Sequence, residues 1–149
     1  CIERETVQAG RRAQAPAAVR AGLAGRHILL CEDHPLNQEI VEALLSEKGA
    51  VTETADDGQL GLEAFERSAI GYYDAVLMDI RMPVMNGYAA ARAIRALNRP
   101  DAGTVPIIAM TADAFGEDVR KCLDAGMNAH IAKPVDPQIF FETLERYMR

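Results

Sequence analysis

The chain is organised around the stretch Asp74-Ala75-Val76-Leu77-Met78-Asp79-Ile80-Arg81-Met82-Pro83. Its apolar run carries no alternation, which predicts a strand covered on both faces of a parallel sheet. The run ends in the carboxylate of Asp79, and open α/β sheets bind their ligands at the carboxyl ends of strands. Arg81 and Pro83 then break the strand. Taken alone, Asp79 could equally cap a helix or bond a loop, so its meaning depends on the rest of the chain.

Composition indicates one ordinary globular domain. The chain has 149 residues, 49% of them hydrophobic and 26% charged, and is long enough to bury a sizeable core. The formal net charge is -6; residues 1–25 carry four Arg and two Glu, a net +2, which leaves -8 for the remainder. We therefore expect neither nucleic acid nor an anionic membrane as a partner, because both reward a basic surface.

The cysteines indicate a reducing compartment. Cys1, Cys31 and Cys122 fit neither a disulfide framework nor a zinc site, and Cys31 is expected to be a small core residue. The sequence shows no membrane span and no signal peptide, so we expect a cytoplasmic domain without direct membrane contact, whose parent protein could be membrane-anchored. Because the chain begins at Cys1 and not at Met, we expect that it was cut from a longer protein.

Two segments are predicted. Residues 1–25 contain repeated Ala and Gly with scattered Arg, and are interpreted as a linker or tether; a helix of a preceding domain is the alternative. Residues 26–149 alternate strand and helix patterns. The predicted strands are 27–31, 50–55, 75–79, 106–110 and 129–132, and the helices that follow them begin near 36, 58, 87, 116 and 137. Right-handed crossovers imply an α/β fold with a doubly wound, five-stranded parallel sheet in the order 2-1-3-4-5.

Some positions follow from the apolar pattern. Val51 is the only large apolar side chain of the second strand, which suits an edge of the sheet. Asp136 is expected to cap the last helix. The inner faces of the first and last helices are predicted to consist of Leu36, Ile40, Val41, Leu44 and Leu45, and of Ile139, Phe140, Phe141, Leu144 and Tyr147.

Polar residues follow four of the five strands. Glu32-Asp33 come after the first strand, Asp79 ends the third, Thr111 ends the fourth and Lys133 follows the fifth. In a parallel sheet these ends share one edge, so three carboxylates, a hydroxyl and an ammonium should converge. Two carboxylates ~4 Å apart repel by roughly 4 kcal/mol at an effective dielectric of ~20. Oxygen ligands without His or Cys favour Mg²⁺.

These residues carry a family resemblance. Glu32-Asp33, Met78-Asp79-Ile80-Arg81-Met82-Pro83, Thr111-Ala112 and Lys133-Pro134 resemble the response-regulator receiver family over about residues 26–149, which implies its flavodoxin-like fold. The sequences of residues 32–38 and 126–134 are similar to those of receivers fused to hybrid sensor histidine kinases. A free-standing receiver is the alternative.

The resemblance implies a role for each residue. Asp79 would accept a phosphoryl group from a phosphohistidine of a histidine kinase dimerisation domain or a histidine phosphotransfer domain. Asp33, Asp79 and the backbone carbonyl of Arg81 would bind Mg²⁺, with Glu32 acting through water. Thr111 would hydrogen-bond the phosphoryl oxygens, and Lys133 would pair with them. Such a domain would catalyse its own phosphorylation and dephosphorylation, and its parent chain would be a hybrid histidine kinase. Lys133-Pro134 would carry a cis peptide.

The sequence departs from the family at two histidines. His130 stands where the family usually has Tyr or Phe, so a weaker aromatic switch is expected. His34 stands where Asn is common and is interpreted as a solvated loop residue. Tyr72-Tyr73 are interpreted as packing or surface residues.

Two other functions compete with phosphoryl acceptance. A phosphohydrolase of the haloacid-dehalogenase type also uses a strand-end Asp, but it needs a second Asp two residues later, where this chain has Arg81. A degenerate receiver that serves only as a protein-binding scaffold is the second alternative. Flavin or nucleotide binding lacks a glycine-rich phosphate loop.

Overall fold

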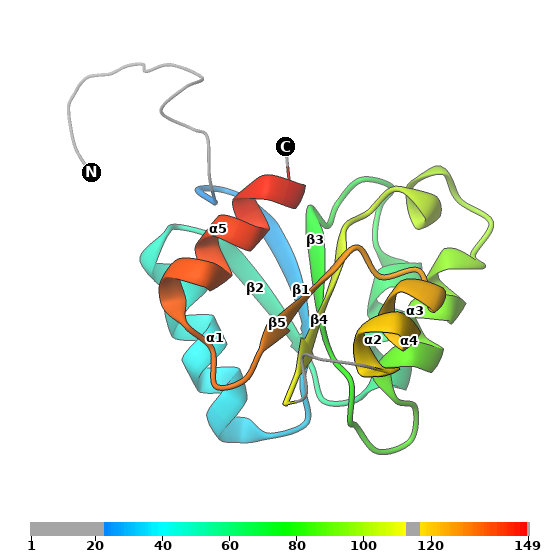
Figure 1. Cartoon of the computed structure of the whole chain (residues 1–149). Helices are drawn as coiled ribbons and strands as arrows, with labels where there is room; N and C mark the ends of the chain where they lie inside the picture. The colour runs from blue at the N-terminus through cyan, green and yellow to red at the C-terminus, as the bar shows by residue number, and fades with distance from the viewer. Residues whose placement is uncertain (1–22, 113–116, 149) are drawn as a thin grey trace.

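The computed structural model describes residues 23–112 and 117–148, which form one five-stranded parallel sheet with helices on both faces (Figure 1). The strand order is β2-β1-β3-β4-β5, as predicted. The strands are β1 (His27–Cys31), β2 (Val51–Ala55), β3 (Ala75–Asp79), β4 (Ile107–Thr111) and β5 (Ala129–Ala132). The helices are α1 (Pro35–Glu47), α2 (Gly58–Arg67), α3 (Gly87–Arg95), α4 (Glu117–Asp124) and α5 (Pro137–Tyr147), with a short 3₁₀ helix, η2 (Pro100–Gly103), before β4. Gly116, the expected start of the fourth helix, lies outside the described residues.

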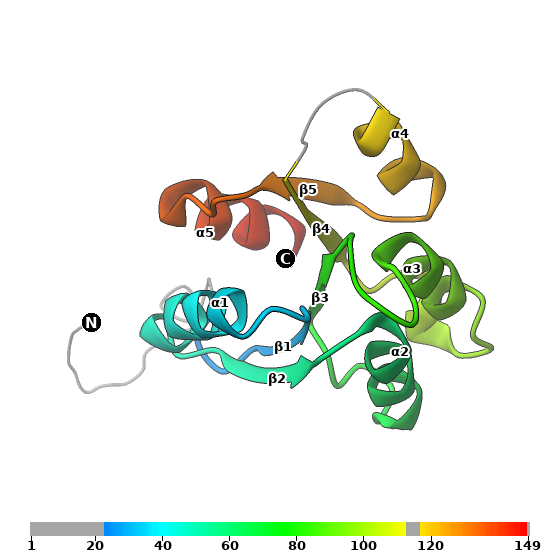
Figure 2. The same cartoon turned by 90° about the horizontal axis from the view of Figure 1, so that it is seen from below.

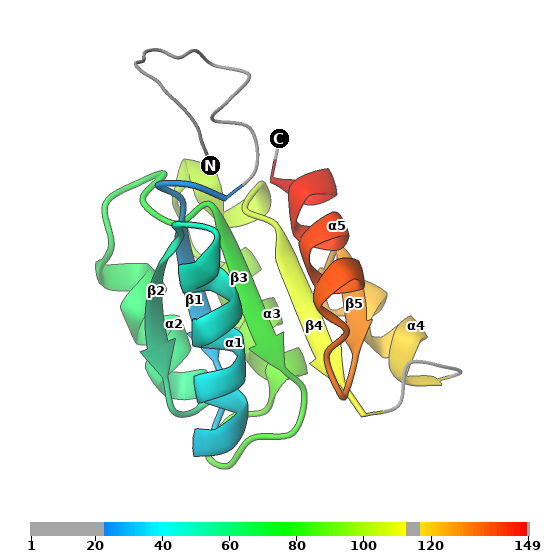
Figure 3. The same cartoon turned by 90° about the vertical axis from the view of Figure 1, so that its left-hand side faces the viewer.

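The helices form two layers. Figures 1 and 3 show α1 and α5 on one face of the sheet and α2, α3 and α4 on the other. Every residue of β3 and β4 is buried, which explains their unbroken apolar runs. At the edge, β2 leaves Val51 47% exposed, as predicted for an edge strand.

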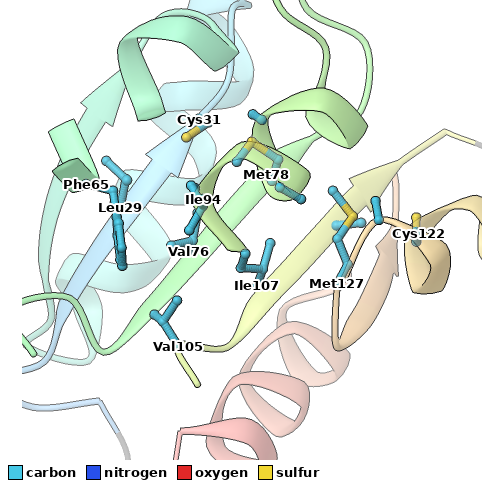
Figure 4. Close-up of a cluster of buried hydrophobic side chains, with 14 of the residues drawn as sticks. Leu29, Cys31, Phe65, Val76, Met78, Ile94, Val105, Ile107, Cys122 and Met127 are labelled. Carbon is cyan, nitrogen blue, oxygen red and sulfur yellow. The ribbon is translucent and has the colours of Figure 1, made fainter. Parts of the chain in front are cut away.

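Each layer has its own core. Side chains from alternate strand positions, among them Leu29 and Val76, pack with Phe65 and Ile94 beneath α2 and α3 (Figure 4). The intervening positions, such as Leu77, pack against α1 and α5. Cys31 belongs to the first core and is fully buried, as expected. Tyr72 and Tyr73 pack as interpreted, since Tyr72 stacks on His27 and Tyr73 on Phe65.

Helix caps follow the sequence signals. Asp136 caps α5, with Oδ1 accepting from the backbone N–H groups of Gln138 at 2.9 Å and Ile139 at 3.2 Å. Asn86 caps α3 in the same way, accepting from Ala89 N–H at 2.9 Å. These caps fix where α3 and α5 begin, and both helices begin at the carboxyl edge of the sheet.

Three predicted core positions are wrong. Leu36, Ile40 and Ile139 are 58%, 44% and 54% exposed, whereas Val41 and Leu45 of α1 are buried. The exposed residues lie in the first two turns of α1 and the first turn of α5. The apolar period identifies the face of a helix, but it does not show which turns of the helix lie over the sheet.

The domain boundary at residue 26 stays a prediction, because residues 1–22 lie outside the described part of the chain. Leu23 is 3% exposed and packs with the α1–α5 core, and Gly25 N–H donates to the carbonyl of Gly49 at 2.9 Å. None of the described helices is long and apolar enough to cross a membrane.

Candidate functional site

An acidic cluster lies at the carboxyl edge of the sheet, which Figure 2 views from below. Glu32, Asp33 and Asp79 each place a carboxylate oxygen within 4.8 Å of the others. Glu32 and Asp79 are 1% and 5% exposed, and Asp33 is exposed. The cluster therefore holds two buried carboxylates and one that faces solvent.

Lys133 is the cation of this cluster. Its Nζ donates to Oδ1 of Asp79 at 2.9 Å and to Oε1 of Glu32 at 3.1 Å. Its side chain is 21% exposed, and it follows β5 at a cis Lys133-Pro134 peptide, as the resemblance implies. One ammonium thus pairs with both buried carboxylates.

Burial sets the charge balance of the site. Burial raises the pKa of Asp79 to about 6; the hydrogen bond from Lys133 opposes this rise, and the charge of Glu32 adds to it. Burial alone would lower the pKa of Lys133, but the hydrogen bonds and charges of Asp79 and Glu32 outweigh it and raise that pKa. Lys133 therefore stays charged, and Asp79 takes up a proton at a higher pH than an ordinary carboxyl group does.

Two glycines position the loop after Asp79. Gly87 N–H donates to the carbonyl of Ile80 at 2.9 Å, and a Cβ at Gly87 would collide with the backbone carbonyl of Asp79. Gly58 N–H donates to the carbonyl of Met85 at 3.1 Å, where a Cβ would likewise collide. The β3–α3 loop, residues 80–86, is thus held at its base by α3 and near its end by α2.

The remaining predicted site residues lie around the same edge. Thr111, at the end of β4, is 3% exposed. Arg81 is exposed and, with Asp33, lines a cavity of about 450 Å³ between the β3–α3 loop and α4. His34 is exposed, in line with its interpretation as a loop residue. His130 is half-buried and lines a separate groove of about 330 Å³ beside α4 and α5.

Sequence reasoning missed Gln38. Its side-chain amide donates to the backbone carbonyl of Glu32 at 2.6 Å and to Oδ1 of Asp56 at 2.9 Å, so it joins the loops after β1 and β2. The backbone N–H of His34 also donates to Oε2 of Glu32, at 3.1 Å. Spacing within the sequence carries no signal for Gln38, since its role depends on the pairing of β1 with β2.

The donor set fits a hard divalent cation. It offers the oxygens of three carboxylates, two of which are buried beside a single ammonium. Neither His nor Cys belongs to the cluster among the described residues. A divalent cation would lower the mutual repulsion of these groups. The cluster is therefore suited to Mg²⁺.

Comparison with known proteins decides the family. A family model described as the response regulator receiver domain matches residues 28–145. The chain belongs to this family. As a receiver domain, it is of the type that acts in two-component phosphorelays, and the sequence-based assignment of family and fold is confirmed.

The similar proteins include histidine kinases and solved receiver domains. "Hybrid signal transduction histidine kinase I" of Dictyostelium discoideum is 35% identical over 119 residues, which cover 78% of this chain and 7% of that protein. The receiver domain of sensor histidine kinase PA1611 from Pseudomonas aeruginosa PAO1, solved with a magnesium ion in its active site cleft, is 43% identical with a TM-score of 0.76, covering 84% of this chain and 98% of that one. The receiver of Saccharomyces cerevisiae Ssk1, solved with the histidine phosphotransfer protein Ypd1, is 25% identical with a TM-score of 0.73, covering 85% and 90%.

The curated relatives are much longer than this chain. It spans only 7–13% of their lengths, which corresponds to their receiver regions. The activity of any longer parent protein is therefore a matter for proposal.

Proposed function

We propose that Asp79 of this receiver accepts a phosphoryl group from a phosphohistidine of a partner domain. One observation carries the proposal: Asp79 ends the central strand, nearly buried, with Lys133 Nζ at 2.9 Å and two further carboxylates within 4.8 Å. This arrangement combines a nucleophilic oxygen with a fixed cation, which phosphoryl transfer requires.

The transfer conserves atoms and charge. A carboxylate oxygen of Asp79 attacks phosphorus and forms an O–P bond, while the N–P bond of the phosphohistidine breaks. The electron pair of that bond stays on the imidazole nitrogen, which then takes up a proton. Lys133 offsets charge on the phosphoryl oxygens, and the Thr111 hydroxyl donates a hydrogen bond to one of them.

Asp33, Asp79 and the backbone carbonyl of Arg81 would hold Mg²⁺, with Glu32 acting through water. When bound, the ion neutralises negative charge on the carboxylates and on the phosphoryl oxygens. The protein contributes the rest: it buries the nucleophile, fixes the β3–α3 loop through Gly58 and Gly87, and supplies the Lys133 ammonium.

Exposed apolar residues beside the site support a helical protein donor. Leu36 and Ile40 lie one turn apart on α1, which begins just after Asp33, and they are 58% and 44% exposed. Together they form an apolar stripe suited to the side of another helix. We infer a histidine phosphotransfer domain or a kinase dimerisation domain as the partner, and a hybrid histidine kinase as the parent.

Intact mass after incubation with acetyl phosphate and Mg²⁺ tests the assignment. We expect the mass to rise by one phosphoryl group, and Asp79→Asn to abolish the rise. Asp124→Asn is the matched control, because Asp124 is an exposed carboxylate at the end of α4. An unchanged phosphorylation yield in Asp79→Asn would exclude Asp79 as the acceptor.

The alternatives are not favoured. The dehalogenase-type reaction needs an acid–base carboxylate two residues after the nucleophile, where this receiver has the exposed side chain of Arg81. A scaffold-only receiver would have no use for a buried carboxylate whose pKa is raised to about 6 beside a paired lysine.

A further inference from the structure

Val84 has a conformation that its side chain disfavours. Its φ is +68°, the only positive value among the described non-glycine residues, and it is β-branched. The backbone N–H of Met85 donates to the carbonyl of Pro83 at 2.7 Å, which makes Val84 the central residue of a γ-turn of the rare, strained kind. Asn or Gly would adopt this backbone with less strain.

The side chain of Val84 also lies in solvent. It is 82% exposed, the highest fraction among the exposed large hydrophobic residues of the described chain. Packing inside the domain therefore does not account for a valine here. The strained turn persists because Gly58 and Gly87 hold the β3–α3 loop at two points.

Val84 lies close enough to Asp79 to be covered by any protein that donates a phosphoryl group to Asp79. Val84 is three residues from Gly87, a span of at most ~11 Å, and Gly87 lies against the backbone of Asp79. A standard interface covers about 800 Å² on each partner, a patch of roughly 16 Å radius. A donor that brings an imidazole nitrogen to Asp79 therefore covers the tip of this loop.

We propose that Val84 is an apolar docking contact for the phosphohistidine-bearing partner, which it meets on the side of Asp79 formed by the β3–α3 loop. The inference rests on the proposed function. It adds that donor preference depends on a side chain that the turn holds outward.

Two substitutions separate the side chain from the strain. Val84→Thr keeps the β-branched shape and the strained backbone but replaces a methyl group with a hydroxyl. Val84→Asn relieves the strain and removes the apolar surface, so its melting temperature should rise by about 4 °C. We expect both variants to accept phosphoryl groups more slowly from a purified phosphorylated histidine phosphotransfer domain at sub-saturating concentration.

Acetyl phosphate provides the reference reaction. The loss of rate with the protein donor should exceed the loss with acetyl phosphate by about tenfold in Val84→Asn and by a smaller factor in Val84→Thr. Ile70→Asn is the matched control: Ile70 is 62% exposed in the loop before β3, at the opposite end of the sheet, and this variant should transfer at the wild-type rate.

The outcomes distinguish this inference from the proposed function. Equal losses with both donors, or no loss in either Val84 variant, would overturn the docking role of Val84 while leaving Asp79 as acceptor. Failure of the wild-type domain to gain a phosphoryl group from either donor would overturn the proposed function itself, and the inference with it.

Discussion

Replacing Asp79 with Asn should stabilise the domain when no divalent cation is present. Asp79 is 5% exposed, and its pKa is raised from the ordinary value of 3.8 to about 6. Such a difference corresponds to roughly 3 kcal/mol of cost for the ionised carboxylate in the folded state. Asn is neutral and similar in shape, but it leaves Lys133 with only Glu32 as a carboxylate partner. We therefore expect a gain of about 1–2 kcal/mol in the free energy of unfolding.

The stability difference between Asp79→Asn and wild type should depend on pH, in a direction that follows from the raised pKa of Asp79. Since the folded pKa of Asp79 is the higher one, the destabilisation is fully present above pH 6 and is lost as pH falls toward 4, because the folded protein takes up the proton first. Urea unfolding in EDTA at pH 7.5 and at pH 4.5 measures the gap between variant and wild type. The gap should be largest at pH 7.5 and should shrink to roughly a third of that size at pH 4.5, while Asp124→Asn should stay within about 0.5 kcal/mol of wild type.

Magnesium should reverse the order. The ion stabilises the wild-type domain in proportion to the logarithm of its concentration over the dissociation constant, and it should stabilise Asp79→Asn much less. A wild-type domain at least as stable as Asp79→Asn in EDTA at pH 7.5 would refute the argument. So would a gap of the same size at both pH values.

Four further perturbations test other parts of the structure. Asp33→Ala should weaken Mg²⁺ binding at least tenfold by calorimetric titration, and equal affinities would remove Asp33 from the site. Thr111→Ala should leave phosphorylation intact but reduce the amide chemical-shift response to it; identical responses would contradict the role of Thr111. Arg99→Lys should lower the free energy of unfolding by ~2 kcal/mol in urea, because lysine lacks the planar fork that bonds Asp101 and the carbonyls ending α2, and an unchanged midpoint would refute this. His130 should not become fully buried in a structure with a phosphoryl mimic, since an imidazole gains less free energy than a tyrosine from burial; a fully buried ring would contradict this.

The sheet and the site edge could be predicted because they depend on simple rules. Strands buried on both faces give unbroken apolar runs, as Ala75–Met78 shows, and such runs mark the strands without reference to tertiary structure. Parallel strands connected by right-handed crossovers bring their carboxyl ends to one edge. The convergence of Glu32, Asp79 and Lys133 follows from these two rules, and the structure brings their side chains together.

What could not be predicted depends on neighbours that are distant in the sequence. Leu36 and Ile40 fit an apolar helical period, yet the structure leaves them exposed because that part of α1 does not lie over the sheet. Val84 carries no local signal for a positive φ, since Gly or Asn usually marks such turns. Its conformation is imposed by contacts that Gly58 and Gly87 make with the loop, and a sequence pattern does not encode those contacts.

In the absence of ligands the site carries an electrostatic free-energy cost, which the binding of a cation reduces. Lys133 is one ammonium for two buried carboxylates, so the metal-free cluster holds more negative charge than its own cation offsets. A divalent cation recovers part of that free energy on binding. Under the proposed function, a phosphoryl group on Asp79 would then give the Lys133 ammonium and the Thr111 hydroxyl a new acceptor in place of the carboxylate. The free energy for a conformational response to phosphorylation would therefore already be present in the unphosphorylated domain, as the cost of keeping Asp79 ionised and buried.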